Sequence, residues 1–411
     1  MRDLPPNFWR LLGASAASNL ADGIFFIVLP LVALRFTDSP MLIAGLALVS
    51  RLPWLVFVLV AGALADRLDR RQTMRTVQLF RVGMVGLLAV LAMTGGLSLP
   101  VLYVAALLLG IGETFFDTAA QSILPSIVDK DRLATANGRL YGVELVMNQF
   151  VGPPLGGLLI VASIPLALGA SVAGYALAAV GLTLVVGIFR PVREGPPTRI
   201  TADIAEGLRY LLRHRVLRTL AAMVGVMNLA SSATAAIFVL YAVAPGPMGL
   251  SEPEFGILST TFAIGSLAGS FAAAPLERRF GRVPLLFASV VAIGVSMAVP
   301  GFTTSAWAVG LSFVVAGFLV VVWNVITVSL RQRIVPDRLL GRLNAAYRLL
   351  AWGSQPIGAL LGGVIGAAIG LPAVFILAGL LGLTLVLTRV VLTEEALRSA
   401  EREGELEAAA A

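Results

Sequence analysis

The stretch LPWLVFVLVAGALADRLDRR, residues 52–71, decides the fold. An apolar run ends at Ala65, and five charges then occupy the six positions from Asp66 to Arg71. Only 13% of the 411 residues are charged, so this cluster stands out from the composition. An apolar run closed by a charged cluster is typical of a membrane helix that ends at a polar surface.

The composition of the chain predicts a membrane protein. Hydrophobic residues make up 58% of it and the mean hydropathy is +0.92, whereas soluble domains typically contain about 45–50% apolar residues. The opening MRDLPPNFWR has no short apolar core followed by a small-residue cleavage site, so we expect the first apolar run to remain as a span. Cysteine is absent, which excludes disulfides and thiolate metal sites.

A helix needs about 20 apolar residues to cross a bilayer, and the sequence contains twelve such runs. They lie at roughly 9–35, 41–65, 75–95, 99–125, 138–162, 165–189, 217–244, 254–276, 283–300, 305–330, 342–369 and 371–391. Glycine and proline interrupt several of them, which packed membrane helices tolerate. The sequence therefore predicts an all-α membrane protein with twelve transmembrane helices.

The basic residues predict the orientation of the spans, because lysine and arginine accumulate in short cytoplasmic loops. With the N-terminus inside, 26 of the 30 basic residues fall in cytoplasmic segments, and the exceptions are Arg35, Arg51, Arg81 and Arg348. We therefore expect a multi-pass protein of the inner cell membrane with both termini in the cytoplasm. The net charge of +7 is spread between apolar runs, which does not indicate nucleic-acid binding.

The second half of the sequence repeats features of the first, in the same order and at an almost constant offset. The matching pairs are SNLAD (18–22) with MNLAS (227–231), LADRLDR (64–70) with LERRFGR (276–282), and IVDKDRLATAN (127–137) with IVPDRLLGRLN (334–344). This repeat predicts two pseudo-symmetric six-helix bundles, residues 1–190 and 216–392.

The longest polar segment, residues 191–215, joins the two predicted bundles. Its prolines predict an extended start, after which Ile204, Leu208, Leu211 and Leu212 recur at helical spacing opposite Arg209 and Arg213. We expect this amphipathic helix to lie on the inner membrane surface. The cytoplasmic tail, residues 393–411, is expected to be disordered or partly helical.

The sequence resembles the major facilitator superfamily over about 380 residues. The signature loop between spans two and three of that superfamily is matched by Gly62, Leu64, Ala65, Asp66, Arg67, Arg70 and Arg71. The fifth-span motif found mainly in its proton-driven antiporters is matched by Gly152, Pro153, Gly156 and Gly157. The DRLDRR form of the loop and the N-L-A-D of span one are similar to the branch of bacterial multidrug, macrolide and siderophore exporters.

The chain departs from the superfamily pattern in two places. Asp69 stands where the loop usually has glycine, although Asp also tolerates turn conformations. The basic residue often found midway along span four of drug antiporters is missing, and that span carries the acids Glu113 and Asp117 instead. A mechanism that relies on the span-four arginine therefore does not carry over.

The resemblance implies a gating role for the charged loop. Asp66 would face the opening of span eleven, where unpaired N–H groups attract a carboxylate. Arg67 belongs to the same gating loop, and Arg70 and Arg71 would bridge to acids of the same bundle and close the cytoplasmic side until the bundles rock. The alternative is that these charges only anchor the topology.

Ionisable residues inside the predicted spans concentrate in the first half. They are Asp22, Arg51, Arg81, Glu113, Asp117 and Glu144, whereas the second-half spans hold only Arg348. A charge inside the membrane costs roughly 2.5–3.5 kcal/mol and indicates function by default. Asp22 and Glu113 lie near mid-depth by helical rise, and Asp117 follows Glu113 by one turn on the same face.

We take Asp22, Glu113, Asp117 and Arg51 as candidates for proton coupling and substrate binding. Desolvation disfavours the charged form of a carboxylate, so acids at these depths are suited to exchange protons while holding a cationic cargo. Two alternatives stay open. In the first, Asp22 forms a permanent ion pair with Arg51 or Arg81 and takes no part in transport. In the second, Asp117 lies close enough to the inner face to have a structural role.

The sequence therefore predicts proton-coupled efflux of amphipathic or hydrophobic small molecules by alternating access, chiefly of drugs and with antibiotic resistance as its outcome. The alternatives are a dedicated exporter of one metabolite such as a siderophore, a lysolipid transporter without proton coupling, or a membrane sensor. No Walker loop, EF-hand, zinc cluster or Ser-His-Asp grouping is present, so we expect neither an enzyme nor a cofactor. The expected partners are the small-molecule substrate, protons and the lipid bilayer, and the expected state is a monomer.

Overall fold

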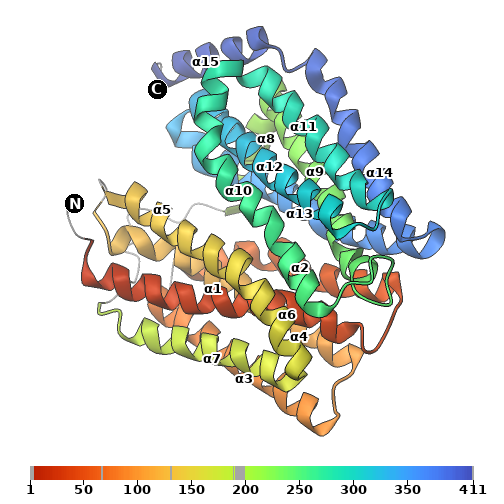
Figure 1. Cartoon of the computed structure of the whole chain (residues 1–411). Coiled ribbons are helices and arrows are strands. Elements are labelled where there is room, and N and C mark those ends of the chain that lie inside the picture. Colours follow the sequence, from red (N-terminus) through yellow and green to blue (C-terminus); the bar gives the residue numbers. More distant parts are fainter. Residues whose placement is uncertain (1–3, 66–67, 130–131, 188, 190–199, 410–411) are drawn as a thin grey trace. The chain divides into compact units, whose positions relative to one another are not determined.

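The computed structural model describes residues 4–65, 68–129, 132–187, 189 and 200–409, and its regular structure is helical (Figure 1). The helices of the first half are α1 (Pro6–Ala33), α2 (Pro40–Ala65), α3 (Arg70–Thr94), α4 (Leu99–Ile123), α5 (Leu133–Glu144), α6 (Gly152–Ala162) and α7 (Ile164–Thr183). Those that follow are α8 (Ile200–Arg213), α9 (Arg215–Ala242), α10 (Glu252–Phe280), α11 (Arg282–Ala298), α12 (Ala306–Ile334), α13 (Asp337–Ile369), α14 (Leu371–Thr384) and α15 (Glu394–Ala409).

Within the described residues, 12 segments are long and apolar enough to cross a membrane. Each predicted span has its counterpart among them in chain order, and all but the fifth overlap a single α-helix, in some cases with a short 3₁₀ extension. The fifth span, Thr135–Ala162, is the composite one, because it joins α5 and α6. The predicted all-α membrane fold is confirmed.

The chain forms two compact units. One comprises Met1–Gly195 and Val239–Thr260, and the other comprises Pro196–Phe238 and Thr261–Ala411. Each unit has a cluster of buried apolar side chains, which includes Phe8 and Ile123 in the first and Leu220 and Leu286 in the second. The bundle limits drawn from the sequence, 1–190, 191–215 and 216–392, stay predictions.

In the first unit, α1 packs against both α6 and α7, and α7 also packs against α3 (Figure 1). Small buried residues of α1, among them Ala14, Ser18 and Ala21, allow this close approach. Membrane helices associate through small residues because lipid gives no hydrophobic drive to bring them together. The helix α1, which carries Asp22, is therefore packed closely against α6 and α7.

The fifth span is interrupted by a π-helical segment, Leu145–Val151, between α5 and α6. Pro153 and Pro154 follow it in the first turn of α6 and have no backbone N–H to donate to the preceding turn. A π-helical turn is the rarer helix form and marks places where the regular hydrogen-bond register changes, frequently at functional sites. The GPPLGG segment thus directly follows a change of hydrogen-bond register within the fifth span.

The expectation for the linker helix is corrected by the position of α8. Leu211 is fully buried and Leu208 packs beside it in the apolar cluster of the second unit. Glu206 forms an ion pair with Arg342 of α13, while Arg209 and Arg213 are exposed. The part of the apolar face of α8 that carries Leu208 and Leu211 is therefore covered by protein, because α13 packs against it, whereas Leu212 is exposed.

Of the two states expected for the C-terminal tail, the structure shows the helical one. Residues Glu394–Ala409 form the helix α15, which packs on α12 with Leu397 and Ala400 buried. Oε1 of Glu401 lies 2.5 Å from Nη1 of Arg282 and 3.6 Å from Nη1 of Arg333. The tail helix therefore joins the start of α11 to the end of α12.

Candidate functional site

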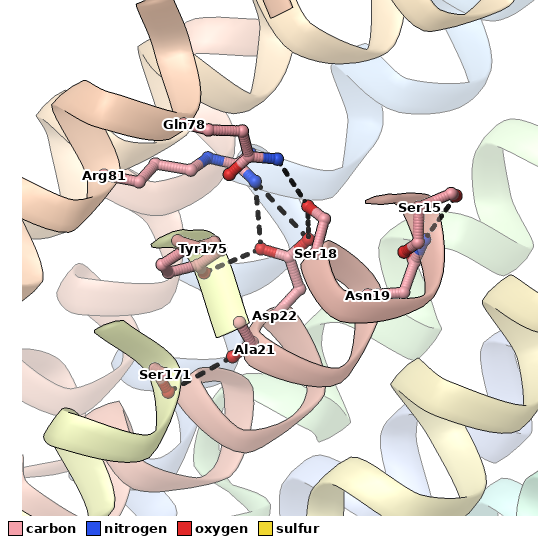
Figure 2. A network of polar contacts seen from close by, with 9 residues as sticks. All are labelled: Ser15, Ser18, Asn19, Ala21, Asp22, Gln78, Arg81, Ser171 and Tyr175. Atoms are coloured by element: carbon pink, nitrogen blue, oxygen red, sulfur yellow. Dashed lines mark hydrogen bonds and ion pairs between the residues drawn. The ribbon is translucent and has the colours of Figure 1, made fainter. Parts of the chain in front are cut away.

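The centre of the site is an ion pair between Asp22 on α1 and Arg81 on α3 (Figure 2). Nη1 of Arg81 lies 3.1 Å from Oδ1 and 3.4 Å from Oδ2 of Asp22. The Arg81 side chain is only 3% exposed, and that of Asp22 is 29% exposed. Of the two arginines expected as possible partners of Asp22, Arg51 and Arg81, the structure pairs it with Arg81.

Two further side chains donate hydrogen bonds to Asp22 (Figure 2). The Tyr175 hydroxyl donates to Oδ1 at 2.7 Å, and the Ser18 hydroxyl donates to Oδ2 at 3.4 Å. Ser18 in turn accepts a bond from the buried amide of Gln78 at 2.7 Å. The Oε1 atom of Gln78 has no hydrogen-bond partner among the described residues, so the network can accept one more donor.

Aromatic rings complete the surroundings of Arg81. Its guanidinium carbon lies 5.2 Å from the ring centre of Phe116 on α4 and 5.3 Å from that of Tyr175 on α7. The faces of aromatic rings attract cations, and more strongly where water is excluded. Arg81 is thereby held by three helices of the first unit besides its own.

The close packing of α7 on α1 explains how Tyr175 reaches Asp22. Its neighbour Gly174 lies against α1, where an added Cβ would stand 2.8 Å from Cβ of Ala21 and 2.9 Å from the Ala17 carbonyl oxygen. Ser171, one turn earlier, donates to the Ala21 carbonyl oxygen at 3.3 Å. A larger residue at 174 would separate the two helices and lengthen the bond from Tyr175 to Asp22.

The acids Glu113 and Asp117 of α4 lie beside this network without joining it. Both side chains are partly exposed, and neither has a hydrogen bond or ion pair to a described residue. Arg51 and Arg81 are the cations that act electrostatically on Glu113, and Arg81 also acts on Asp117. The cluster thus contains more carboxylates than cations.

Arg51 and Glu144 lie at the edges of the cluster. Both side chains are exposed, and Glu144 is the last residue of α5 before the π-helical segment. Glu144 acts electrostatically on Asp117, and Arg51 on Glu113. Among the described residues, no group of three or more His, Asp or Glu side chains is placed to hold a metal ion.

The predicted gating loop is described only in part. Asp66 and Arg67 lie outside the described residues. Asp69 caps α3 by accepting from the Gln72 backbone N–H at 3.0 Å, and its other oxygen accepts from the Phe189 backbone N–H at 2.9 Å. The usual glycine is thus replaced by a residue that ties the loop to the end of the sixth span.

The expected partners of Arg70 and Arg71 need correction. Arg70 donates to the Ser122 carbonyl oxygen at 2.6 Å and to the Ser126 hydroxyl at 3.2 Å, and Arg71 donates to the Val185 carbonyl oxygen at 2.6 Å. The contacts described for these guanidinium groups therefore go to neutral oxygens at the ends of spans four and six, not to acids. Helix C-terminal carbonyls lack intrahelical partners and carry partial negative charge, so they attract arginine.

The glycines of the fifth-span motif lie at close approaches between helices. An added Cβ on Gly152 would stand 2.6 Å from Cα of Gly23, and one on Gly156 would stand 2.9 Å from the Ile24 carbonyl oxygen. Gly157 instead faces the Glu252 carbonyl oxygen, within the same compact unit, with a corresponding distance of 2.5 Å. Pro153 is buried at the start of α6. Gly152 and Gly156 thus pack α6 against α1 next to Asp22, and Gly157 packs α6 against the start of α10.

Sequence reasoning missed the neutral members of the network, Ser18, Gln78 and Tyr175. A signal for two of them was present, because Ser18 precedes Asp22 by four residues and Gln78 precedes Arg81 by three. Residues at those spacings share one face of a helix. Nothing in the sequence pointed to Tyr175, which depends on the packing of α7.

The family model described as "Transmembrane secretion effector" matches residues 7–409. The chain belongs to this family. It is a multi-pass membrane exporter of the major facilitator superfamily and not an enzyme.

The chain is similar to the multidrug efflux pump Tap of Mycolicibacterium fortuitum, with 28% identity over 380 residues that cover 89% of this chain and 90% of the pump. It is also similar to the enterobactin exporter EntS of Shigella boydii, with 26% identity over 376 residues that cover 88% and 86%.

Solved structures support the superfamily fold. A bacterial homologue of the iron transporter ferroportin in its inward-facing state matches with a TM-score of 0.71 at 17% identity, over 94% of this chain and 99% of that one. The nucleoside transporter NupG matches with a TM-score of 0.74 at 12% identity, over 94% and 99%. These likenesses show the fold alone.

Proposed function

We propose that this exporter moves amphipathic or hydrophobic small molecules out of the cell in exchange for protons. One observation carries the proposal. The spans of the first unit contain the acids Asp22, Glu113 and Asp117 around Arg81, the one cation that is buried among the described residues of these spans. Carboxylates are costly inside a membrane and mark proton or substrate pathways.

The proposed cycle uses the acids as exchangeable sites. A proton that enters down its gradient neutralises a carboxylate that otherwise favours a cationic cargo, so proton and cargo occupy the cluster in turn. Alternating access then exposes the cluster to one side and to the other as the bundles rock. Coupling requires that the cargo and the proton each bind less well in the presence of the other.

Drugs are the substrate class that we propose first. The similarity to the multidrug efflux pump Tap along most of both chains supports this choice. The similarity to the enterobactin exporter EntS favours a second candidate, a dedicated exporter of one siderophore. A thermal-shift screen of drugs and siderophores against purified protein separates them, because a multidrug exporter responds to several unrelated compounds and a dedicated one responds to a single class.

We further propose that the protein lies in the inner membrane as a monomer with both termini in the cytoplasm. The excess of basic residues in one set of loops supports that orientation. The charged loop, with Asp66, Arg67, Arg70 and Arg71, would then act on the cytoplasmic side. Contacts of Arg70 and Arg71 with carbonyl oxygens at the ends of spans four and six support a role in joining those ends.

Proteoliposomes test the proposed coupling. Purified protein is reconstituted with a fluorescent cationic dye, and a pH gradient is imposed across the vesicle membrane. We expect dye to move against the direction of proton flow and to stop when an ionophore dissipates the gradient. Equal transport with and without the gradient would exclude antiport.

A further inference from the structure

We propose that Glu113 and Asp117 carry the exchanged proton, whereas Asp22 stays ionised as the fixed counter-charge of Arg81. This assignment rests on the proposed proton-coupled function and names the groups that perform it. It separates three acids that the sequence presents as equivalent candidates. The separation comes from the partners that each carboxylate has in the structure.

The partners of Asp22 favour its charged form. Its two oxygens accept from Arg81, from Tyr175 at 2.7 Å and from Ser18 at 3.4 Å. Hydrogen bonds to a carboxylate and a nearby cation both favour ionisation. Protonation of Asp22 would also leave Arg81, which is 3% exposed, without the counter-charge to which it is hydrogen-bonded. Removing one partner of a buried ion pair is strongly destabilising, because the remaining charge is left uncompensated.

Glu113 and Asp117 have the opposite surroundings. Neither accepts a hydrogen bond from a described residue, so a proton can bind without displacing a donor. They are four residues apart on α4 and therefore share one face of the helix. A proton on one of them relieves its repulsion with the other, so the pair is expected to titrate as a unit.

The charges around the α4 acids support the same assignment. The groups that act on them are Arg51 of α2, Arg81 of α3, Asp22 of α1 and Glu144 of α5. Once Asp22 and Arg81 cancel, the α4 pair carries two negative charges against the one positive charge of Arg51, which is exposed. Glu144 adds to the negative excess. Binding of a proton or of a cationic cargo would neutralise this excess negative charge.

Charge-paired neutralisation tests the assignment. Wild type, Asp22→Asn, the double variant Asp22→Asn/Arg81→Gln and the double variant Glu113→Gln/Asp117→Asn are reconstituted in proteoliposomes. Each is assayed for dye transport driven by a pH gradient and for dye exchange at equal pH, which needs no net proton movement. Thermal midpoints and gel-filtration profiles monitor folding.

We expect Asp22→Asn to lose about tenfold or more of both activities, because Arg81 is left uncompensated, a loss corresponding to at least about 1.4 kcal/mol. Removing the Arg81 charge as well should restore gradient-driven transport to within about threefold of wild type, a difference below about 0.7 kcal/mol. The Glu113→Gln/Asp117→Asn variant should lose driven transport and exchange the cationic dye more slowly, because these acids take the proton and also attract the cargo. Gradient-driven transport that persists in this variant would overturn the assignment. A double variant Asp22→Asn/Arg81→Gln that exchanges dye but is no longer driven by the gradient would overturn the assignment.

The set of variants separates the assignment from the function on which it rests. A wild type without gradient dependence refutes the proposed antiport itself, whatever the variants do. If the Asp22→Asn/Arg81→Gln protein does not fold, the variant Tyr175→Phe tests which acid titrates. It keeps both charges and removes one hydrogen-bond donor from Asp22. An unchanged pH midpoint of transport supports the α4 pair, and a midpoint displaced by about half a unit or more identifies Asp22 as the titrating group.

Discussion

Arg81 of α3 contacts side chains of three other helices in the first unit. Its guanidinium is buried, paired with Asp22 and placed between the rings of Phe116 and Tyr175. An arginine is suited to this position, because its planar group stacks on aromatic faces while it donates in a fixed geometry. Lysine has the same charge but a compact head without a plane that stacks on the two rings.

Arg81→Lys should therefore destabilise the protein although it conserves the charge. We expect a loss of about 1–3 kcal/mol from the weakened contacts with the two rings. The thermal midpoint in detergent measures the effect. Arg75→Lys is the matched control, since Arg75 lies on the same helix with its side chain exposed. Equal midpoints for the two variants would mean that the ring contacts contribute nothing.

At the residue scale, the sequence indicated the charges but not their pairing. Asp22, Arg51, Arg81, Glu113 and Asp117 stand out because charges inside apolar runs are rare and costly. Which cation meets Asp22 depends on how α1 and α3 are rotated about their axes. That rotation is set by packing at positions such as Gly174, which hydropathy does not encode.

At the scale of elements, the contact between α1 and α6 depends on glycine. Gly152→Ala should push the two helices apart, because the added methyl would stand 2.6 Å from Cα of Gly23, and backbone atoms cannot move aside as a flexible side chain can. We expect a loss of about 1–3 kcal/mol, as for overpacking elsewhere. The loss is read from the thermal midpoint.

Gly142→Ala is the control for that substitution. Gly142 lies in α5 of the same span, and nothing stands within 4 Å of its added Cβ. Alanine has the higher helix propensity, so this variant should be neutral or slightly more stable. A destabilised Gly142→Ala protein together with an unaffected Gly152→Ala protein would contradict the packing described for α6.

The tail helix α15 provides a second prediction about an element. Glu401→Gln should lower the stability of the second unit, because Glu401 accepts from Arg282 at 2.5 Å and lies 3.6 Å from Arg333. Hydrogen bonds to charged groups contribute about 1.5–3 kcal/mol. Glu403→Gln is the control, since its side chain is exposed on the same helix. Limited proteolysis should cleave the tail of the Glu401→Gln protein first, and identical digestion patterns would argue against the contact.

The positions of the helices could be predicted from hydropathy, but the surfaces against which α8 and α15 pack could not. All twelve spans were found because an apolar run of about 20 residues is long enough to cross a bilayer and rarely occurs in soluble helices. The amphipathic pattern of α8 shows only that one face is covered, and it does not distinguish lipid from protein. The docking of α8 and α15 depends on faces of the second unit that are far away in the sequence.

At the scale of the whole molecule, the absence of cysteine makes the topology directly testable. Thr304→Cys lies in the exposed loop before α12, and Ser399→Cys lies on the exposed face of α15. We expect an impermeant maleimide to label Thr304→Cys in right-side-out vesicles and Ser399→Cys only in inverted ones. Labelling of both from the same side would contradict cytoplasmic termini with an even number of spans.

The most direct measurement is the number of protons displaced when cargo binds to purified protein. In weakly buffered detergent solution, adding a transported dye to wild type should acidify the medium, because cargo and proton occupy the same acids. The Glu113→Gln/Asp117→Asn protein should bind the dye more weakly and release no protons even when the dye saturates it, and Tyr141→Phe, an exposed tyrosine of α5, should behave as wild type. Tight dye binding to wild type with no proton release at any pH would contradict proton exchange at these acids.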